Sequence, residues 1–273
     1  PRGRSQTVIC TDGTQLATVS MGSGPPILLG HGYTANLANW ALVAPLLVEA
    51  GHQVVMFDQR GHGESTVGSD GFGVPQLGSD LASVLEQLEL TSATVVGHSM
   101  GGIGLQSLLV NHRESAARRV AGAVFLSTLA TGLGSPLGKH AKLGLLKSSL
   151  FDRIRSNDLH GLFFTSRIFG QDPALSQVEA ALNLARQCPL ETVYGALMPL
   201  LDFDLSDQVG QITQPSMVIC GTQDKVTFPA SSQNLANAIN ADLYWLEGAG
   251  HATPFERFKR VAELTIAHAA HTG

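Results

Sequence analysis

The sequence predicts an α/β fold, with a mostly parallel eight-stranded sheet, helices on both faces of the sheet and an inserted helical lid. Eight short, mostly apolar runs predict the strands, and helix-periodic segments separate most of them. This alternation is typical of a parallel sheet. Only 14% of the 273 residues are charged, against roughly 25% in an average domain, which suits a sheet that is buried on both faces.

The chain is expected to begin with a hairpin. The runs Thr7–Cys10 and Gln15–Ser20 flank Asp12-Gly13, a dipeptide that favours a tight turn between antiparallel strands. These two strands should therefore add an antiparallel edge to the sheet. The six runs that should continue the sheet are Pro26–Leu29, Gln53–Phe57, Ala93–Val96, Ala121–Leu126, Ser216–Cys220 and Leu243–Leu246.

Helices are predicted between these strands because apolar residues recur there at helical spacing. The final helix should begin with Thr253 as its N-cap, with Pro254 in the first turn and Glu256 completing a capping box. The other helical segments of the core are the pattern Leu77, Leu81, Val84, Leu85 and Leu88, the run Ile103–Val110, and the stretch Ser231–Ile239.

The segment from about Thr131 to Ser206 interrupts this alternation, because it lacks β-branched runs and contains helical patterns instead. We therefore predict a core formed by residues 1–130 and 207–273, and a lid of three or four helices over residues 131–206. A lid at the carboxyl ends of the strands would control substrate selectivity. Its patterns are Leu175, Val178, Leu182 and Ala185, followed by Leu190, Val193, Leu197 and Leu200.

The segment Gly97-His98-Ser99-Met100-Gly101-Gly102 follows one predicted strand and precedes a predicted helix. A serine with glycines two residues before and after it fits a sharp strand-to-helix turn, in which larger flanking side chains would clash. The helix N-terminus favours negative charge that develops near the serine. Ser99 is therefore the candidate nucleophile, and the alternative is a serine that caps a helix in a glycine-rich loop.

A serine hydroxyl needs a base, and the base needs a carboxylate that orients it. His251 follows the last predicted strand, and Asp224 follows the strand Ser216–Cys220, so both should reach the edge of the sheet that carries Ser99. A turn or an ion pair with Lys225 is the alternative role for Asp224. The other candidates for the carboxylate that orients the base are Asp202, Asp204 and Asp207.

If Ser99 attacks a carbonyl carbon, the carbonyl oxygen becomes negatively charged, and this oxyanion needs two hydrogen-bond donors. We expect them to be the backbone N–H of Met100, directly after Ser99, and that of Tyr33, which follows Gly30-His31-Gly32. The polar, glycine-rich loop Asp58–Ser65 should organise the neighbouring loops by hydrogen bonds. His31, His62 and His98 are expected to form hydrogen bonds in the turns around the site rather than to act as the base.

Several other functions lack support in the sequence. The net charge is −5 and the basic residues are scattered, so no nucleic-acid partner is expected. Cys10, Cys188 and Cys220 form neither a metal spacing nor a disulfide framework, and no glycine-rich nucleotide motif follows a strand. We therefore expect no metal and no cofactor. Without an apolar leader or an 18-residue apolar stretch, we expect no membrane span and a cytoplasmic protein.

Together these motifs resemble the α/β-hydrolase superfamily, in its serine-nucleophile branch of esterases, haloperoxidase-like enzymes and carbon–carbon bond hydrolases. The matching pieces are His31-Gly32, the Asp58–Ser65 loop, the turn at residues 97–102, residues 221–224 and residues 248–251, in the order that the family shows. Two positions differ from many relatives. Thr34 stands where a proline is common, and Ser99 replaces the aspartate of relatives that open epoxides or remove halides.

The resemblance implies a serine hydrolase, and the expected substrate is a small to medium, hydrophobic carboxylic ester. Three alternatives remain. A carbon–carbon bond hydrolase would need a cation for a substrate carboxylate, for which Arg167 or Arg186 are candidates. In perhydrolysis, peroxide would attack in place of water. A low-turnover ligand-binding receptor would keep the same fold, because fold alone does not determine function.

Overall fold

The protein has one eight-stranded sheet, in the order β1-β2-β4-β3-β5-β6-β7-β8, in the computed structural model, which describes residues 3–133 and 157–273. β1 pairs antiparallel with β2 and β2 with β4, whereas all other neighbours are parallel. The strands are β1 (Arg4–Ile9), β2 (Gln15–Met21), β3 (Pro26–Gly30), β4 (Gln53–Phe57), β5 (Ala93–His98), β6 (Val120–Leu126), β7 (Ser216–Gly221) and β8 (Asp242–Leu246).

All eight predicted strands are present, and their bounds differ from the prediction by a few residues at most. The predicted hairpin is also confirmed: Gly13, at φ +83°, lies in the turn between β1 and β2. The parallel register aligns the ends of the strands, since His98 pairs with Leu126 and Gly221 with Leu246. The segments that follow β5, β7 and β8 consequently leave the sheet at the same edge.

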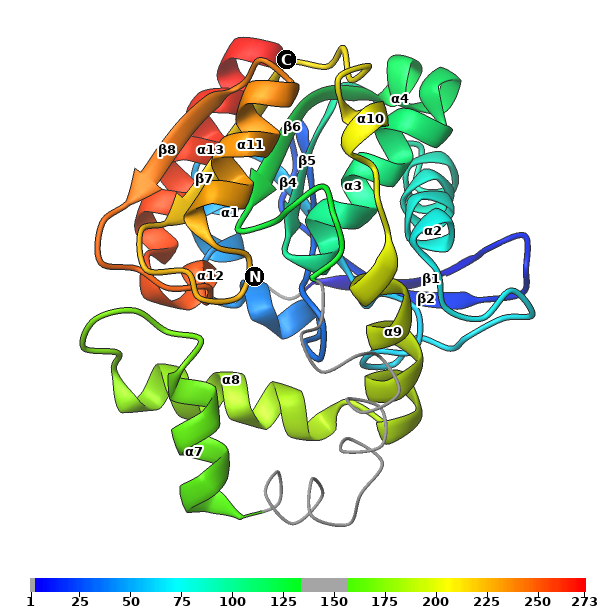
Figure 1. Cartoon of the computed structure of the whole chain (residues 1–273). Coiled ribbons are helices and arrows are strands. Elements are labelled where there is room, and N and C mark those ends of the chain that lie inside the picture. Colours follow the sequence, from blue (N-terminus) through cyan, green and yellow to red (C-terminus); the bar gives the residue numbers. More distant parts are fainter. Residues whose placement is uncertain (1–2, 134–156) are drawn as a thin grey trace.

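Helices cover both faces of the sheet (Figure 1). On one face, α1 (Ala44–Glu49) and α13 (Phe258–Thr272) pack against the sheet in a core that includes Leu29, Val96 and Val261. The opposite face carries the core around Leu28, Val95 and Leu105. Its helices are α2 (Val74–Gln87), α3 (Met100–Asn111), α4 (Arg113–Arg119), α10 (Ser206–Val209) and α11 (Pro229–Ala238). The central strands are therefore buried on both faces, as the low charge content predicts.

Of the described helices between β6 and β7 in the chain, three form a group beyond the end of the sheet (Figure 1). They are α7 (Asp158–Ser166), α8 (Leu175–Gln187) and α9 (Leu190–Asp202). α8 and α9 match the two helical patterns predicted in this segment. We call residues 157–202 the inserted helices; the remainder of the predicted lid, residues 134–156, lies outside the described residues.

The end of the chain differs from the prediction in two respects. The expected final helix is divided at Arg257 into α12 (Thr253–Glu256) and α13. The predicted capping box was wrong, because Ala252 is the N-cap of α12 and forms no side-chain cap. The short helices η1 (Leu37–Trp40), α1, α4 and α10 were not predicted, because few residues in them carry a periodic pattern.

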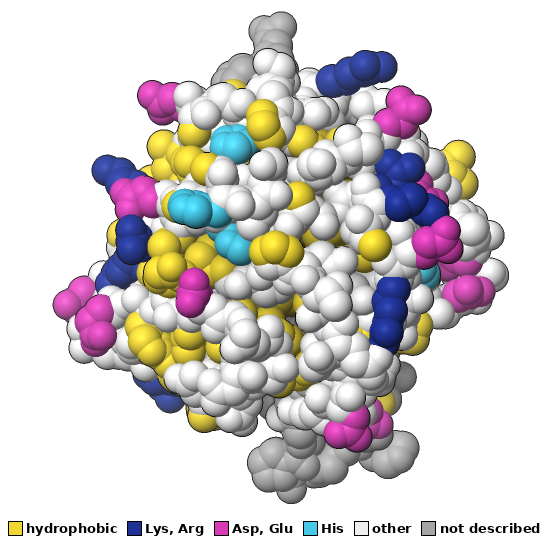
Figure 2. All heavy atoms as spheres, turned by 90° about the horizontal axis from the view of Figure 1, so that it is seen from above, with side chains coloured by type: hydrophobic (Ala, Val, Ile, Leu, Met, Phe, Trp, Pro, Cys, Tyr) yellow, Lys and Arg dark blue, Asp and Glu magenta, His cyan; other side chains and the backbone are white. Residues whose placement is uncertain are grey.

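The surface shows no concentration of one charge sign on the face drawn in Figure 2, where Lys and Arg are interspersed with Asp and Glu. Among the described helices, none is both long and apolar enough to cross a bilayer. In residues 3–133 and 157–273, no group of three or more His, Cys, Asp or Glu side chains is arranged to hold a metal ion.

Candidate active site

Ser99 occupies a strained turn between β5 and α3. Its φ is +52° and its ψ is −115°, a backbone conformation that residues other than glycine rarely adopt. The flanking glycines permit this turn. A Cβ on Gly97 would lie 2.4 Å from the carbonyl oxygen of Gly101, and a Cβ on Gly101 would lie 2.3 Å from that of Gly30. Both contacts are too short for any side chain, as the motif predicts.

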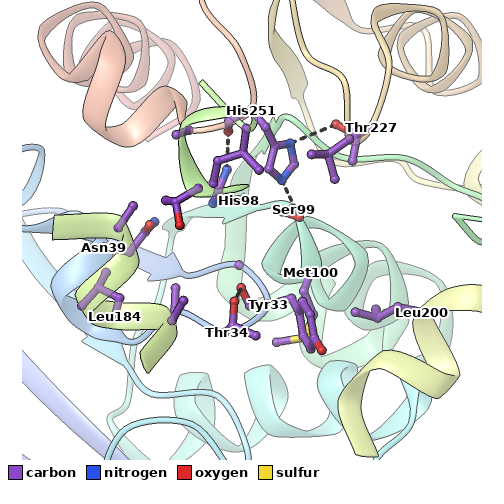
Figure 3. Close-up of a pocket in the computed structure, with 18 of the residues that line it drawn as sticks. Tyr33, Thr34, Asn39, His98, Ser99, Met100, Leu184, Leu200, Thr227 and His251 are labelled. Atoms are coloured by element: carbon purple, nitrogen blue, oxygen red, sulfur yellow. Dashed lines mark hydrogen bonds between the residues drawn. The ribbon is translucent and has the colours of Figure 1, made fainter. Parts of the chain in front are cut away.

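The three candidate residues Ser99, Asp224 and His251 form one chain of hydrogen bonds, of which Figure 3 shows the bond between Ser99 and His251. His251 Nε2 lies 3.0 Å from Ser99 Oγ, and His251 Nδ1 lies 2.9 Å from Asp224 Oδ2. An ionised carboxylate only accepts hydrogen bonds, so Nδ1 carries the proton and Nε2 is left to accept the serine O–H. In this arrangement Nε2 of His251 faces Ser99 as a hydrogen-bond acceptor.

Asp224 is buried and its carboxylate is fully engaged. Oδ1 accepts from the backbone N–H groups of Val226 and Thr227, at 2.8 and 2.9 Å, and Oδ2 accepts from the Thr227 hydroxyl at 2.7 Å. Burial alone would raise the pKa of Asp224, but the adjacent His251 and these hydrogen bonds outweigh it and lower the pKa. The carboxylate therefore stabilises the turn at Val226 and Thr227 and also faces His251.

The backbone of His251 is held from two sides. Its carbonyl oxygen accepts from Nε2 of His98 at 2.9 Å, and its N–H donates to the carbonyl oxygen of Ile168 at 2.7 Å. Ile168 follows α7, so one of these two contacts comes from the inserted helices. The His98 ring is buried, and burial, with the neighbouring His251, lowers its pKa to about 3, so His98 is neutral.

The loop after β3 lies directly against Ser99. A Cβ on Gly32 would be 3.3 Å from Cβ of Ser99, so a side chain at position 32 would have to displace its neighbours slightly. Tyr33 and Met100 both line the same cavity as Ser99. Met100 is the first residue of α3, where N–H groups have no acceptor within the helix. Thr34, at φ +58°, donates its N–H to Nε2 of His62 at 3.2 Å.

The loop of residues 58–65 braces these turns with buried hydrogen bonds. Asp58 accepts from the N–H groups of Leu37 and Glu64, at 2.7 and 2.9 Å, and His31 Nε2 accepts from the N–H of Gln59 at 2.9 Å. Burial lowers the pKa of His31 to about 4 and that of His62 to about 3. Both rings are therefore neutral near pH 7 and serve as hydrogen-bonding groups in the turns.

A cavity of about 590 Å³ opens onto Ser99 and His251. This size lies within the usual range of small-molecule sites. The described residues that line it include no Lys, Arg, Asp or Glu. Its walls are mostly apolar and come from the core and from all three inserted helices, for example Ile103, Leu129, Phe164, Leu182, Leu197 and Leu200.

The two arginines considered for binding a substrate carboxylate do not line this cavity. Arg186 pairs with Asp158 at 2.9 Å, and the Arg167 guanidinium lies 5.9 Å from the centre of the Phe163 ring. Asp204, a rival to Asp224, accepts from Ser206 at the surface. The contacts of Thr227 and Ile168 with the site were not predicted, because no motif marks them and only the folded chain brings them to His251.

Comparison with known proteins agrees with this geometry. A family model described as the alpha/beta hydrolase fold matches residues 25–258. The chain is 26% identical over 260 residues to non-heme chloroperoxidase CPO-A1 of Kitasatospora aureofaciens, covering 89% of this chain and 91% of the relative. It is 26% identical over 242 residues to 3-oxoadipate enol-lactonase 2 of Acinetobacter baylyi, covering 88% and 87%.

Two solved structures share the fold over nearly the whole chain. An esterase from Exiguobacterium antarcticum superimposes with a TM-score of 0.86 at 22% identity, and a bromoperoxidase from Bacillus anthracis with 0.84 at 23%. Each comparison covers 98% of this chain and 100% of the solved one. The sheet order, the turn at Ser99 and the extent of the family match lead to one conclusion: the chain belongs to the alpha/beta hydrolase fold family.

Proposed function

We propose that this protein hydrolyses carboxylic esters of small to medium apolar substrates through an acyl-enzyme. The observation that carries the proposal is the continuous contact from Ser99 Oγ through His251 to Asp224, at the end of a cavity whose described lining residues carry no charge. His251 takes the serine proton as Oγ attacks the carbonyl carbon, and then delivers it to the leaving alcohol. Asp224 orients the ring and stabilises the imidazolium.

We assign the stabilisation of the oxyanion in the tetrahedral intermediate to the backbone N–H groups of Tyr33 and Met100. Both residues border the cavity beside Ser99. Donors already oriented toward the developing charge lower the barrier, because they need no reorganisation during the reaction. In the second half of the reaction, His251 removes a proton from water, which attacks the acyl-enzyme and releases the acid and the free Ser99 hydroxyl.

The inserted helices are proposed to act as the lid that selects the acyl or alcohol group. Phe164, Leu182 and Leu197 contribute one wall of the cavity from three different helices. The described residues of this wall carry no charge and so favour neutral, apolar substrate parts, because a desolvated carboxylate would find no cation among them. The described part of the cavity therefore does not favour a carbon–carbon bond hydrolase, which needs a cation for its substrate carboxylate.

Hydrolysis of p-nitrophenyl esters of graded acyl length tests the proposal. Each buried methylene contributes about 0.8 kcal/mol, so kcat/KM should rise roughly fourfold per carbon until the cavity is filled. Ser99→Ala should abolish the release of p-nitrophenol while the circular-dichroism spectrum stays unchanged. A folded wild-type protein that releases no p-nitrophenol from any chain length would exclude the esterase function.

Perhydrolysis is a second candidate, because a relative that matches 89% of the chain is named as a non-heme chloroperoxidase. In this reaction hydrogen peroxide replaces water in attacking the acyl-enzyme, and the products are a peracid and the free Ser99 hydroxyl. The test is bromide oxidation in acetate buffer with peroxide. Activity that disappears in Ser99→Ala would support perhydrolysis, and activity unaffected by that substitution would exclude it.

A further inference from the structure

A short segment of the inserted helices runs alongside the loop that carries His251. Besides the contact of the His251 N–H with Ile168, the N–H of Gln171 donates to the carbonyl oxygen of Gly248 at 2.8 Å. The same carbonyl of Ile168 also lies 3.3 Å from the N–H of Ala252. Residues 168–171 and 248–252 are thus joined by backbone hydrogen bonds, although about 80 residues separate them in the chain.

The two backbones touch so closely that glycine is required on both sides. A Cβ on Gly170 would lie 2.0 Å from the carbonyl oxygen of Gly248. A Cβ on Gly250 would lie 2.4 Å from the carbonyl carbon of Phe169. The position of the loop before His251 therefore depends directly on the position of residues 168–171.

One side chain joins the two segments. The Glu256 carboxylate accepts from the N–H of Gly250, with both oxygens at 3.0 Å, and from the N–H of Gly170 at 2.7 Å. One of these donors immediately precedes His251 and the other belongs to the inserted helices. Hydrogen bonds to an ionised carboxylate are among the stronger ones in proteins, and these two converge on a single group.

We propose that Glu256 is a positioning residue for His251, which fastens the base-bearing loop to the inserted helices. The proposal rests on the esterase function inferred above. Ser99 and Asp224 hold the His251 ring, whereas the loop bearing it is held by His98 as well as by Glu256 and Ile168. Without the carboxylate, two partly buried N–H groups lose their acceptor, and only the backbone hydrogen bonds still join the two segments. A displacement of about 1 Å at a catalytic group can cost roughly a hundredfold in rate.

The test measures how fast a fluorophosphonate labels Ser99, because this reaction needs His251 as base but does not depend on the choice of ester. Glu256→Ala removes the acceptor, and Glu256→Gln keeps one oxygen in a side chain of nearly the same shape. Glu263→Gln is the matched control, since Glu263 lies on the exposed surface of α13 and pairs with Arg260 at 3.1 Å. Melting temperatures are recorded for all variants, and labelling is measured well below them.

We expect labelling to slow about ten- to a hundredfold in Glu256→Ala and severalfold in Glu256→Gln, with Glu263→Gln unchanged. A lower melting temperature with a wild-type labelling rate, in either folded Glu256 variant, would show a purely structural role and overturn the proposal. If the Ala variant does not fold, the Gln variant decides. Absence of labelling at Ser99 in the wild type would instead overturn the proposed function.

Discussion

The hydroxyl of Tyr33 donates a 2.5 Å hydrogen bond to the backbone carbonyl oxygen of Val193, so the loop after β3 is joined to helix α9. One residue earlier in the same helix, the Thr192 hydroxyl donates to the carbonyl oxygen of Gly61 at 2.6 Å. α9 thus holds two of the loops that surround Ser99. The amide proposed for the oxyanion and the wall of the substrate cavity belong to one connected unit.

Tyr33→Phe should weaken this connection while leaving the backbone amide in place. Loss of one such hydrogen bond costs about 0.5–1.5 kcal/mol. We expect kcat/KM for a medium-chain p-nitrophenyl ester to fall roughly two- to tenfold, since both the oxyanion donor and the cavity wall become less well placed. Tyr244→Phe, on the exposed strand β8, should behave as the wild type. Equal effects of the two substitutions would contradict the connection.

Asp224→Asn should reduce kcat by about 10³- to 10⁴-fold, because an amide can stabilise the wrong tautomer of His251 and no longer offsets the charge of the imidazolium. The fold should remain, since an amide oxygen can still accept from the N–H groups of Val226 and Thr227. Steady-state kinetics with circular dichroism measure both properties. Asp204→Asn, at the surface, provides the comparison and should retain full activity.

Gly101→Ala should destabilise the protein through the clash with the carbonyl oxygen of Gly30, at 2.3 Å from the new Cβ. Overpacking of this kind costs about 1–3 kcal/mol. The free energy of unfolding in urea measures the effect. Gly210→Ala is the control, because its nearest neighbour would lie at an ordinary 3.5 Å. If both variants unfold at the same urea concentration, the turn does not have the close packing described here.

Stability should decrease as the pH falls below about 6.5. Burial lowers the pKa of His31 to about 4 and those of His62 and His98 to about 3, from the ordinary 6.5. Below pH 6.5 the unfolded chain binds protons that the folded protein does not, so the loss continues until the folded pKa values are reached. Each histidine could contribute up to about 2 kcal/mol between pH 6.5 and 5.

Urea unfolding at pH 7, 6 and 5 measures this dependence. The lowered pKa of Asp224 acts in the same direction, but its contribution is lost only at lower pH, where its unfolded carboxyl becomes protonated. We therefore expect the first loss of stability in the histidine range. A free energy of unfolding that is constant from pH 7 to pH 5 would mean that these rings bind protons equally in the folded and unfolded protein, so that burial does not lower their pKa values.

The sequence alone determined the fold class and identified the residues that meet at the candidate site. Hydrophobic periodicity is a local property, so it predicted all eight strands and the helices α2, α3, α8, α9 and α11. The glycines around Ser99 avoid steric clashes within the turn. Because this requirement is local, it can be read directly from the sequence. The positions of Asp224 and His251 after strands were enough to predict that they would meet Ser99, because parallel strands end at one edge of the sheet.

Only the tertiary structure decided how the site is held together. Glu256 followed a local pattern for a capping box, yet its carboxylate binds Gly250 and Gly170 instead. The contacts of Ile168 with His251 and of Tyr33 with Val193 join residues 83 and 160 positions apart. Such contacts depend on how the inserted helices pack on the core. Backbone carbonyls carry no sequence signature, so only the folded chain reveals which of them hold the site.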